Sequence, residues 1–134
     1  MAVPEKIGPT SLSVTELRKA CNLNDGVGCA KLGYLYHTGE GIKQDFTKAK
    51  QYYSKACNSS AYISVACNNL GELYEYGEGV TQDYSEARKY YGKACGDGYN
   101  ISCTNLGILY MEGKGVQENS SEAKKYFKRG CNLS

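Results

Sequence analysis

Seven cysteines are the residues of this chain whose type and spacing point most clearly to chemistry. Six of them form three closely spaced pairs with seven, nine and seven intervening residues, Cys21/Cys29, Cys57/Cys67 and Cys95/Cys103. Members of a pair return at a regular interval along the chain, which predicts that the two cysteines of each pair are joined by a disulfide. The seventh, Cys131, would be the first member of a fourth pair and is predicted to be unpaired.

Two other uses of these cysteines remain open from the sequence. A zinc site would need ligands about two to four residues apart and usually histidine, whereas this chain has one histidine and wider spacings. Free cysteines buried in a cytosolic protein are the second alternative, although the regular positions argue against it. Disulfides would place the protein in an oxidising compartment, so we expect it to be secreted or periplasmic, with a signal peptide outside this sequence.

One serine matches a catalytic motif. Ser121 and Lys124 have the Ser-x-x-Lys spacing of serine β-lactamases, in which the serine attacks the lactam carbonyl. The same register positions elsewhere in the chain hold Thr47 and Ser85, so the string belongs to a recurring segment. The chain has neither a Ser-Asp-Asn nor a Lys-Thr-Gly element. We therefore interpret Ser121 as a residue at a helix start and predict no catalytic residue.

The single histidine, His37, is a further candidate. A general base needs a nucleophile and an orienting acid within reach. The positions equivalent to His37 hold Glu75 and Met111, and this variability favours a side chain that faces solvent. We expect the protein to bind neither a metal nor a cofactor.

The segments that must position these residues are repeated. Leu32-Gly33-Tyr34-Leu35-Tyr36 returns at residues 70–74 and 106–110, with offsets of 38 and then 36 residues. The block at 52–57 likewise returns at 90–95 and 126–131. A period of this length is typical of stacked supersecondary units rather than of one globular core with one pocket. It favours a binding surface over an enzyme.

Each unit is expected to contain two antiparallel helices. The first, helix A, covers about 29–38, 65–76 and 102–112, and the second, helix B, begins at an N-cap formed by Asp45, Asp83 or Asn119. Glycine recurs inside helix A at positions 33, 71 and 107, although it costs about 1 kcal/mol there. This predicts the close approach of a neighbouring backbone or ring. Tyrosine, with 13 copies, is the expected large core residue, and each buried hydroxyl needs a partner.

Composition excludes several classes of partner. The net charge is +2 with acids and bases interspersed, so a nucleic-acid partner is not expected. No apolar run approaches the ~18 residues that span a bilayer, so membrane insertion is not expected either. We predict a monomer whose partner is a protein or peptide.

These motifs together resemble the Sel1-like repeat, a family akin to tetratricopeptide repeats. The resemblance rests on the pattern Leu-Gly-x-x-Tyr-x-x-Gly-x-Gly-Val, followed by Asp-(Tyr/Phe)-x-x-Ala-x-x-Tyr-Tyr-x-Lys-Ala-Cys. The paired cysteines are similar to those of the cysteine-rich Sel1-like proteins of Helicobacter. The resemblance implies an all-α, right-handed α/α solenoid of about three helix pairs, pinned by disulfides. It covers about residues 13–131.

The same resemblance predicts how the chain is divided. Residues 1–12 form an N-terminal tail, and residues 13–134 form the repeat array. Within the array, residues 13–22 are a degenerate helix B, and the repeats cover about 28–57, 65–95 and 102–131.

The resemblance also implies two kinds of function. Sel1-like arrays generally act as adaptor scaffolds, whereas some cysteine-rich members are described as penicillin-binding proteins or weak β-lactamases. We favour a non-catalytic scaffold that binds a protein or peptide. The alternatives are binding and slow hydrolysis of penicillins or a related cell-wall peptide, and a structural or immunogenic protein without one fixed ligand.

A ligand groove is predicted on the concave side, which helix A generally lines. It consists of the variable stripe of helix A, Lys31, Tyr34, Thr38, Asn69, Glu72, Tyr76, Asn105, Ile108 and Glu112. Asparagine offers a donor and an acceptor, which suits gripping the backbone of an extended peptide. Asn-Leu-Gly at 69–71 and 105–107 is similar to the asparagine step of peptide-binding tetratricopeptide helices. The alternative is that the stripe is merely a solvated face.

Overall fold

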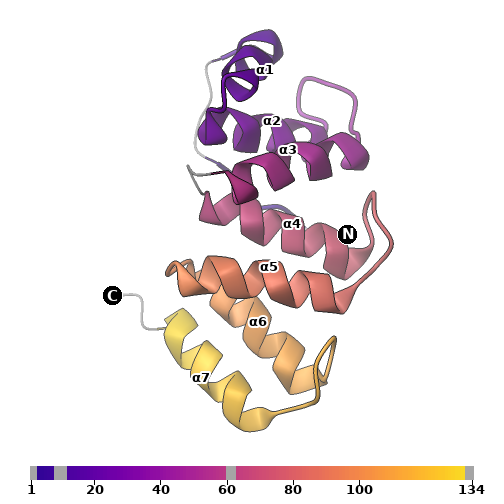
Figure 1. Ribbon diagram of the computed structural model, residues 1–134. Coiled ribbons are helices and arrows are strands. Elements are labelled where there is room, and N and C mark those ends of the chain that lie inside the picture. Colours follow the sequence, from indigo (N-terminus) through magenta and orange to yellow (C-terminus); the bar gives the residue numbers. More distant parts are fainter. Residues whose placement is uncertain (1–2, 8–11, 60–62, 132–134) are drawn as a thin grey trace.

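The computed structural model describes residues 3–7, 12–59 and 63–131, and in these residues all regular structure is helical. The helices are α1 (Val14–Asn22), α2 (Gly26–Thr38), α3 (Phe46–Asn58), α4 (Ser64–Tyr76), α5 (Tyr84–Gly96), α6 (Asn100–Glu112) and α7 (Ser120–Cys131). They stack as successive antiparallel pairs, with α1 packed on α2 at one end and α7 at the other (Figure 1). The expectation of an all-α solenoid is confirmed.

The ends of the helices follow from local sequence. Asp45 and Asp83 accept hydrogen bonds from the first backbone N–H groups of α3 and α5, and Asn119 does the same for α7. The three helix-A elements each end at a glycine in the left-handed region, with φ of 77°, 66° and 65° at Gly39, Gly77 and Gly113. Glycine is the residue that adopts this conformation without steric cost.

The recurring glycines inside helix A make room for rings of helix B. A Cβ atom added to Gly33 would lie 2.7 Å from the ring of Tyr53, and one added to Gly71 would lie 2.7 Å from the ring of Tyr91. Gly107 has the same relation to Phe127, at 2.8 Å. The predicted close approach is therefore confirmed, and it is an aromatic ring that approaches.

Tyrosine pairs link helices A and B on a second face of each pair. Tyr36 stacks on Tyr52 at 5.7 Å, Tyr74 on Tyr90 at 5.8 Å, and Tyr110 on Tyr126 at 5.4 Å between ring centroids. Each pair therefore carries one ring under its glycine and one stacked aromatic contact. Small alanines of helix B, such as Ala49 and Ala87, are fully buried beside them.

All three predicted disulfides are present, and each joins a helix B to the helix A that follows it. The bonds are Cys21–Cys29 between α1 and α2, Cys57–Cys67 between α3 and α4, and Cys95–Cys103 between α5 and α6. Their Cα–Cα separations are 4.6, 4.8 and 4.7 Å. These six cysteines are buried, whereas Cys131 is exposed and forms no disulfide within the described residues.

The second cysteine of each disulfide lies deeper in its helix than the sequence predicts. The sequence places the start of helix A at about residues 29, 65 and 102, but α2, α4 and α6 begin at residues 26, 64 and 100. Cys29, Cys67 and Cys103 are therefore each the fourth residue of their helix. Their N–H groups donate to the carbonyls of Asp25, Ile63 and Tyr99 at 3.0, 3.2 and 3.3 Å. The helices begin earlier than expected because the first turn of a helix comes before its first internal backbone hydrogen bond.

In the described part of the chain, no helix is long and apolar enough to cross a membrane.

Candidate peptide-binding site

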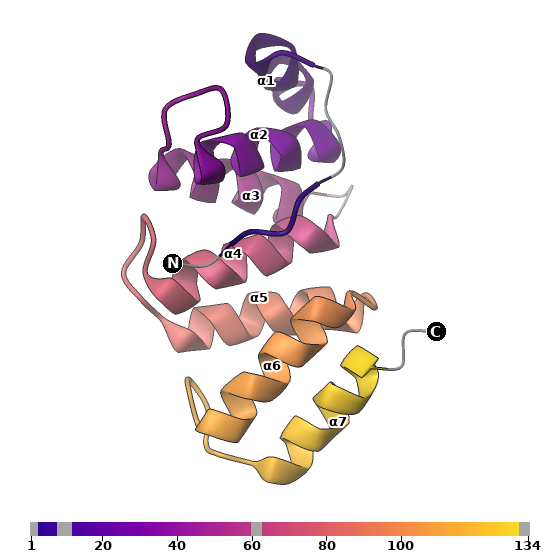
Figure 2. The ribbon, with the colours of Figure 1, turned by 180° about the vertical axis from the view of Figure 1, so that it is seen from behind.

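The residues of the predicted groove all lie on α2, α4 and α6, which face the viewer in Figure 2. We call this side of the molecule the helix-A face. Its middle is not open to solvent, because Asn69 is fully buried and Glu72 is 8% exposed. At the C-terminal end of α4 and on α6, respectively, Tyr76 and Ile108 remain 52% and 38% exposed. The side chains of the predicted stripe therefore differ in their exposure to solvent: some are buried and others are exposed.

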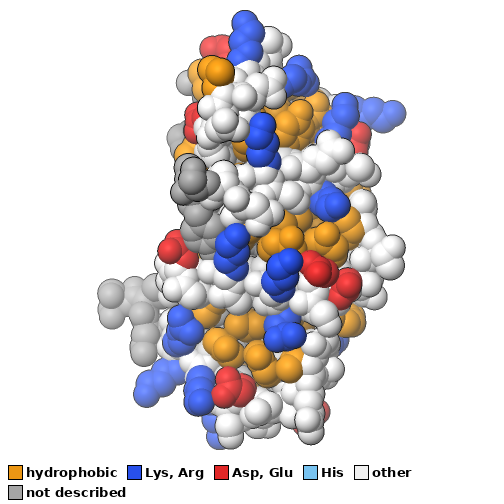
Figure 3. All heavy atoms as spheres, in the orientation of Figure 1, with side chains coloured by type: hydrophobic (Ala, Val, Ile, Leu, Met, Phe, Trp, Pro, Cys, Tyr) orange, Lys and Arg blue, Asp and Glu red, His pale blue; other side chains and the backbone are white. Residues whose placement is uncertain are grey.

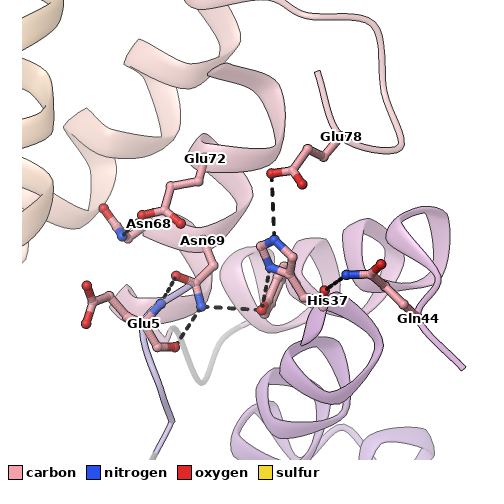
Figure 4. Close-up of polar contacts among 8 residues, drawn as sticks. Glu5, His37, Gln44, Asn68, Asn69, Glu72 and Glu78 are labelled. Atoms are coloured by element: carbon pink, nitrogen blue, oxygen red, sulfur yellow. Dashed lines mark hydrogen bonds and ion pairs between the residues drawn. The ribbon is translucent and has the colours of Figure 1, made fainter. Parts of the chain in front are cut away.

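The chain's own N-terminal segment, residues 3–7, covers the middle of this face. It has no regular secondary structure and runs along α4 in the opposite direction (Figure 2). The side-chain amide of Asn69 holds it at both backbone groups of Glu5 (Figure 4). The Glu5 N–H donates to Asn69 Oδ1 at 3.0 Å, and Asn69 Nδ2 donates to the Glu5 carbonyl at 3.1 Å.

The segment is also fixed by its apolar residues. Pro4 is buried, and Ile7 is half-buried against the hydrophobic core. By contrast, Lys6 is exposed and Val3 is 84% exposed. The segment is thus held by the two backbone hydrogen bonds of Glu5 to Asn69 and by the burial of two apolar residues, Pro4 and Ile7.

Behind the clamp, a chain of hydrogen bonds leads into the core. Asn69 Nδ2 also donates to the Tyr53 hydroxyl at 3.4 Å, and that hydroxyl lies 3.1 Å from His37 Nδ1. Because the hydroxyl accepts from Asn69, its own hydrogen is available to Nδ1, which leaves the imidazole proton on Nε2. Nε2 faces Glu78 Oε1 at 4.0 Å (Figure 4).

The prediction that His37 faces solvent is wrong. The side chain is enclosed by α2, by Phe46 and Tyr53 of α3, and by the loop that carries Glu78, and it is 2% exposed. Burial lowers the pKa of His37 to about 4, so the imidazole is neutral near pH 7. A buried neutral histidine that holds a tyrosine hydroxyl is a structural residue.

A signal in the sequence would have placed His37 correctly. The equivalent residue of the next repeat, Glu75, accepts a 2.7 Å hydrogen bond from the hydroxyl of Tyr91. In the third repeat the helix-B position holds Phe127, which has no hydroxyl, and the helix-A position holds Met111. The variation at 37, 75 and 111 therefore follows the hydroxyl of the ring that each must satisfy.

A second polar cluster, not foreseen from the sequence, joins α4 to α6. Asn68 Oδ1 accepts from Ser102 Oγ at 2.6 Å and from Asn105 Nδ2 at 3.1 Å. Asn68 Nδ2 donates to Glu72 Oε1 at 3.4 Å. Burial, followed by the charges of Glu5 and a neighbouring glutamate, raises the pKa of Glu72 to about 8. Glu72 is therefore largely protonated at neutral pH.

The helix-A face opens beside α6. A hollow of about 240 Å³ is lined by Glu75, Tyr76, Gln82, Tyr84, Asn105, Ile108, Glu112 and Lys114. Four residues of the predicted groove, Tyr76, Asn105, Ile108 and Glu112, meet there. The three from α2, Lys31, Tyr34 and Thr38, are half-buried and line a different part of the face. The Thr38 hydroxyl donates to the Tyr34 carbonyl at 3.0 Å.

The residues of the β-lactamase-like string lie away from these features. Ser121 and Lys124 are both exposed at the start of α7. In the described ranges, no group of three or more His, Cys, Asp or Glu side chains is arranged to hold a metal ion.

Comparison with known proteins gives the same architecture. The Sel1 repeat model matches residues 26–60, 64–99 and 100–134. The protective antigen c5321 of uropathogenic Escherichia coli, described as having an SLR fold, superposes with a TM-score of 0.84 at 32% identity, over 90% of this chain and 25% of that one. A Sel1 repeat protein from Oxalobacter formigenes gives a TM-score of 0.81 at 31% identity, over 90% and 49% of the two chains.

Two cysteine-rich relatives come from Helicobacter pylori. Cysteine-rich protein B, HcpB, is 35% identical with a TM-score of 0.66, over 92% of both chains. HcpD, named a putative beta-lactamase, is 42% identical over 43 residues, which is 32% of this chain and 14% of that protein. The chain thus spans a quarter or less of c5321 and HcpD.

The repeated helix pairs, the disulfides that join consecutive pairs and these matches agree. Disulfides persist in oxidising compartments, and with the cysteine-rich relatives they favour an extracytoplasmic location. Sel1 repeats are scaffolds consistent with protein–protein interaction. This chain belongs to the Sel1 repeat family, within which its paired cysteines relate it to the Helicobacter cysteine-rich proteins.

Proposed function

We propose that the chain is a secreted or periplasmic, non-catalytic scaffold that binds an extended protein or peptide segment on its helix-A face, and that it acts as a monomer. The observation that carries the proposal is the clamp between Asn69 and the two backbone groups of Glu5. The sequence predicts this interaction for asparagine, whose side-chain amide can both donate to and accept from the backbone of an extended segment. Backbone recognition of this kind gives affinity without demanding one sequence.

The hollow beside α6 offers a place for further contacts of such a ligand. Its Tyr76 and Ile108 are exposed apolar side chains, and tyrosine contributes contact area at low entropic cost. Asn105 occupies the register position of Asn69 one repeat later and lies at the same hollow. A ligand that is longer than the N-terminal segment could therefore be contacted by α4 and α6 together.

The test uses peptides selected for binding. Twelve-residue peptides from a phage-displayed random library are selected on the full chain, synthesised with a fluorescent label and titrated by anisotropy. We expect Tyr76→Ala and Asn105→Ala to weaken binding about tenfold while leaving helical circular dichroism unchanged. Lys55→Ala, an exposed change on helix B, is the matched control. Equal affinity of all four proteins would place the ligand elsewhere and contradict the proposal.

The name of HcpD favours a second candidate, β-lactam hydrolysis. Ser121 is the residue that would act as nucleophile, but it is exposed on the first turn of α7. We expect wild type and Ser121→Ala to hydrolyse a chromogenic cephalosporin at the same background rate. Turnover by the wild type that disappears in Ser121→Ala would establish this second function instead.

A further inference from the structure

Charge is separated between the two sides of the molecule, although acids and bases are interspersed in the sequence. We call the side formed by α1, α3, α5 and α7 the helix-B face. These helices contain twelve basic and three acidic residues, a net charge of +9 in a chain whose total is +2. The basic residues are Arg18, Lys19, Lys48, Lys50, Lys55, Arg88, Lys89, Lys93, Lys124, Lys125, Lys128 and Arg129, and the acidic ones are Glu16, Glu86 and Glu122. Such a separation favours an anionic partner on this face.

Apolar side chains lie among these charges. Helices α3, α5 and α7 face the viewer in Figure 1, and Figure 3, in the same orientation, shows Lys and Arg spread between patches of apolar side chains. A basic side chain of helix B lies over one ring of each stacked tyrosine pair. The distances from the cation to the ring centroid are 5.3 Å for Lys48 and Tyr36, 5.0 Å for Lys89 and Tyr90, and 5.9 Å for Arg129 and Tyr126. We call these three arrangements the cation–tyrosine sites.

The cations of these sites keep hydrogen-bond donors for a ligand. Among the described residues Lys48 makes no ion pair, and Lys89 approaches Glu86 at 3.8 Å on an exposed helix surface, where such a pair contributes little. Arg129 donates one N–H to the Cys95 carbonyl at 3.1 Å and has further N–H groups. The ring attracts its cation at these distances. Each cation is therefore restrained before a ligand binds, which lowers the entropic cost of binding an anion.

The three sites follow one another along the stack of repeats. Lys48 lies in the first turn of α3, Lys89 in the second turn of α5, and Arg129 in the third turn of α7. The cations thus form a line that crosses the three helices obliquely, which suits an extended ligand.

The first site also opens into a hollow. Its volume is about 330 Å³, and it is lined by Tyr36, Ile42, Lys43, Gln44, Asp45 and Lys48. This volume is at the lower end of the range for small-ligand sites. Lys43 brings a second ammonium group next to the ring, so one unit of a charged polymer has both room and two cations there.

We propose that the helix-B face binds an extended acidic polysaccharide, with its carboxylate or sulfate groups at the cation–tyrosine sites and its sugar hydroxyls bonded to the tyrosine hydroxyls and lysine N–H groups. A nucleobase would need a free aromatic face, whereas each ring under a cation is already covered by that cation and by its stacked partner. The extracytoplasmic location that the disulfides favour agrees with such a ligand. The inference goes beyond the proposed function, because it uses the opposite side of the molecule and different residues.

The first experiment removes site cations at constant net charge. A fluorescently labelled heparin octasaccharide is titrated by anisotropy with the full chain at several salt concentrations. The test variant combines Lys48→Gln with Lys89→Gln. The control combines Lys6→Gln with Lys114→Gln, which lie on the helix-A side, one exposed and one at the hollow beside α6. Both variants lose two positive charges.

We expect the test variant to bind about tenfold more weakly than the wild type, and the slope of log affinity against log salt to fall by about two. The control variant should lose about twofold or less. An equal loss in the two variants would mean that net charge alone drives binding and would overturn the proposal, as would the absence of heparin binding at low salt.

The second experiment identifies the class of polymer. Unlabelled heparin, polygalacturonate, an oligodeoxythymidylate and oligoglutamate, matched in number of charges, compete for the labelled heparin. We expect the two polysaccharides to displace it at about tenfold lower concentrations than the other two polymers, because only they combine anionic groups with sugar hydroxyls. Equally effective competition by the oligodeoxythymidylate or by oligoglutamate would show a general polyanion site, and the assignment to polysaccharide would be wrong.

The third experiment tests the tyrosine ring and separates the two proposals. Tyr126→Leu removes the ring under Arg129 at a half-buried position, and we expect heparin binding to weaken about threefold with helical circular dichroism unchanged. Unaltered affinity of the folded variant would contradict the role of the ring. Tyr76→Ala and Asn105→Ala, which should weaken peptide binding, should leave heparin binding intact. Loss of heparin binding in these two variants would place the polysaccharide on the helix-A face and overturn this inference alone.

Discussion

Asn69 and Asn105 occupy the same position in neighbouring repeats, yet they have different surroundings. Asn69 is fully buried and bonds to Glu5 and Tyr53, whereas Asn105 is half-buried at the rim of a hollow and donates to Asn68. The local sequence, Asn-Leu-Gly, is identical at both places. The difference therefore comes from what lies beside each asparagine, which is the N-terminal segment at Asn69 and a hollow at Asn105.

The second and third repeats also differ in how tightly they hold the helix-B ring that packs against the helix-A glycine. Tyr91 is fully buried and its hydroxyl donates to Glu75. Phe127, at the same position of the last helix, is half-buried and has no hydroxyl. Repetition of a sequence motif thus produces equivalent backbones but unequal constraint, with the interior repeat more rigidly fixed than the terminal one.

The largest predicted difference between the repeats is at the helix-A glycines. In Gly71→Ala the new methyl group would meet the ring of Tyr91 and the carbonyl of Ala87, neither of which can move freely. We expect the free energy of unfolding to fall by about 3 kcal/mol. In Gly107→Ala the methyl group would likewise meet the carbonyl of Ala123, at 3.2 Å, and the ring of Phe127. The ring of the half-buried Phe127 can turn aside, so the loss should be smaller, about 1–2 kcal/mol. Urea unfolding measures both, and equal losses would contradict the difference in rigidity.

A smaller difference is expected at the two asparagines. Asn69→Ala removes the clamp on Glu5 and leaves the Tyr53 hydroxyl with one partner fewer, at a cost of about 2 kcal/mol. Asn105→Ala removes one bond at the edge of a hollow and should cost about 0.5 kcal/mol. Thermal unfolding under identical conditions compares the two variants. A larger loss for Asn105→Ala would show that the N-terminal segment does not stabilise α4.

The smallest predicted effect concerns pH. The pKa of Glu72 is raised to about 8 from an ordinary value of 4.5, so the folded protein holds more protons there than the unfolded chain, and stability falls as the pH rises through that range. His37 has the opposite sign, since its pKa is lowered from 6.5 to about 4 and stability is lost as the pH falls through that interval. Above pH 6.5 Glu72 is the one of the two that still titrates differently in the folded and unfolded chain.

We therefore expect the free energy of unfolding to decline between pH 6.5 and 8, by about 1–2 kcal/mol. Glu72→Gln retains an oxygen that can accept from Asn68 and removes the titration, so its profile should be flat over this range. Glu112→Gln, an exposed change in the third repeat, should leave the decline intact. A decline that persists in Glu72→Gln would assign it to another group.

The positions at which sequence and structure disagree on the helix-A face share one cause. Variability at position 37 favours a solvent-facing side chain, but that variation follows the ring hydroxyl of helix B, which is a relation between two helices. The pattern also places Glu72 in an open groove, whereas a segment more than sixty residues away in sequence lies near it. In both cases the deciding partner comes from another element, and local periodicity carries no information about it.

The helices of this protein and their covalent ties could be derived from local sequence and repetition alone. The repeat period predicted the helix pairs, Asp45 and Asp83 marked helix starts, and Gly71 indicated a close ring. The recurring spacing of Cys29, Cys67 and Cys103 from their partners predicted the disulfides, although it placed these cysteines too near the helix starts. The occupation of the helix-A face by residues 3–7, and the grip of Asn69 on them, followed from the folded arrangement instead. Such contacts join segments that are distant in sequence, and no local pattern encodes them.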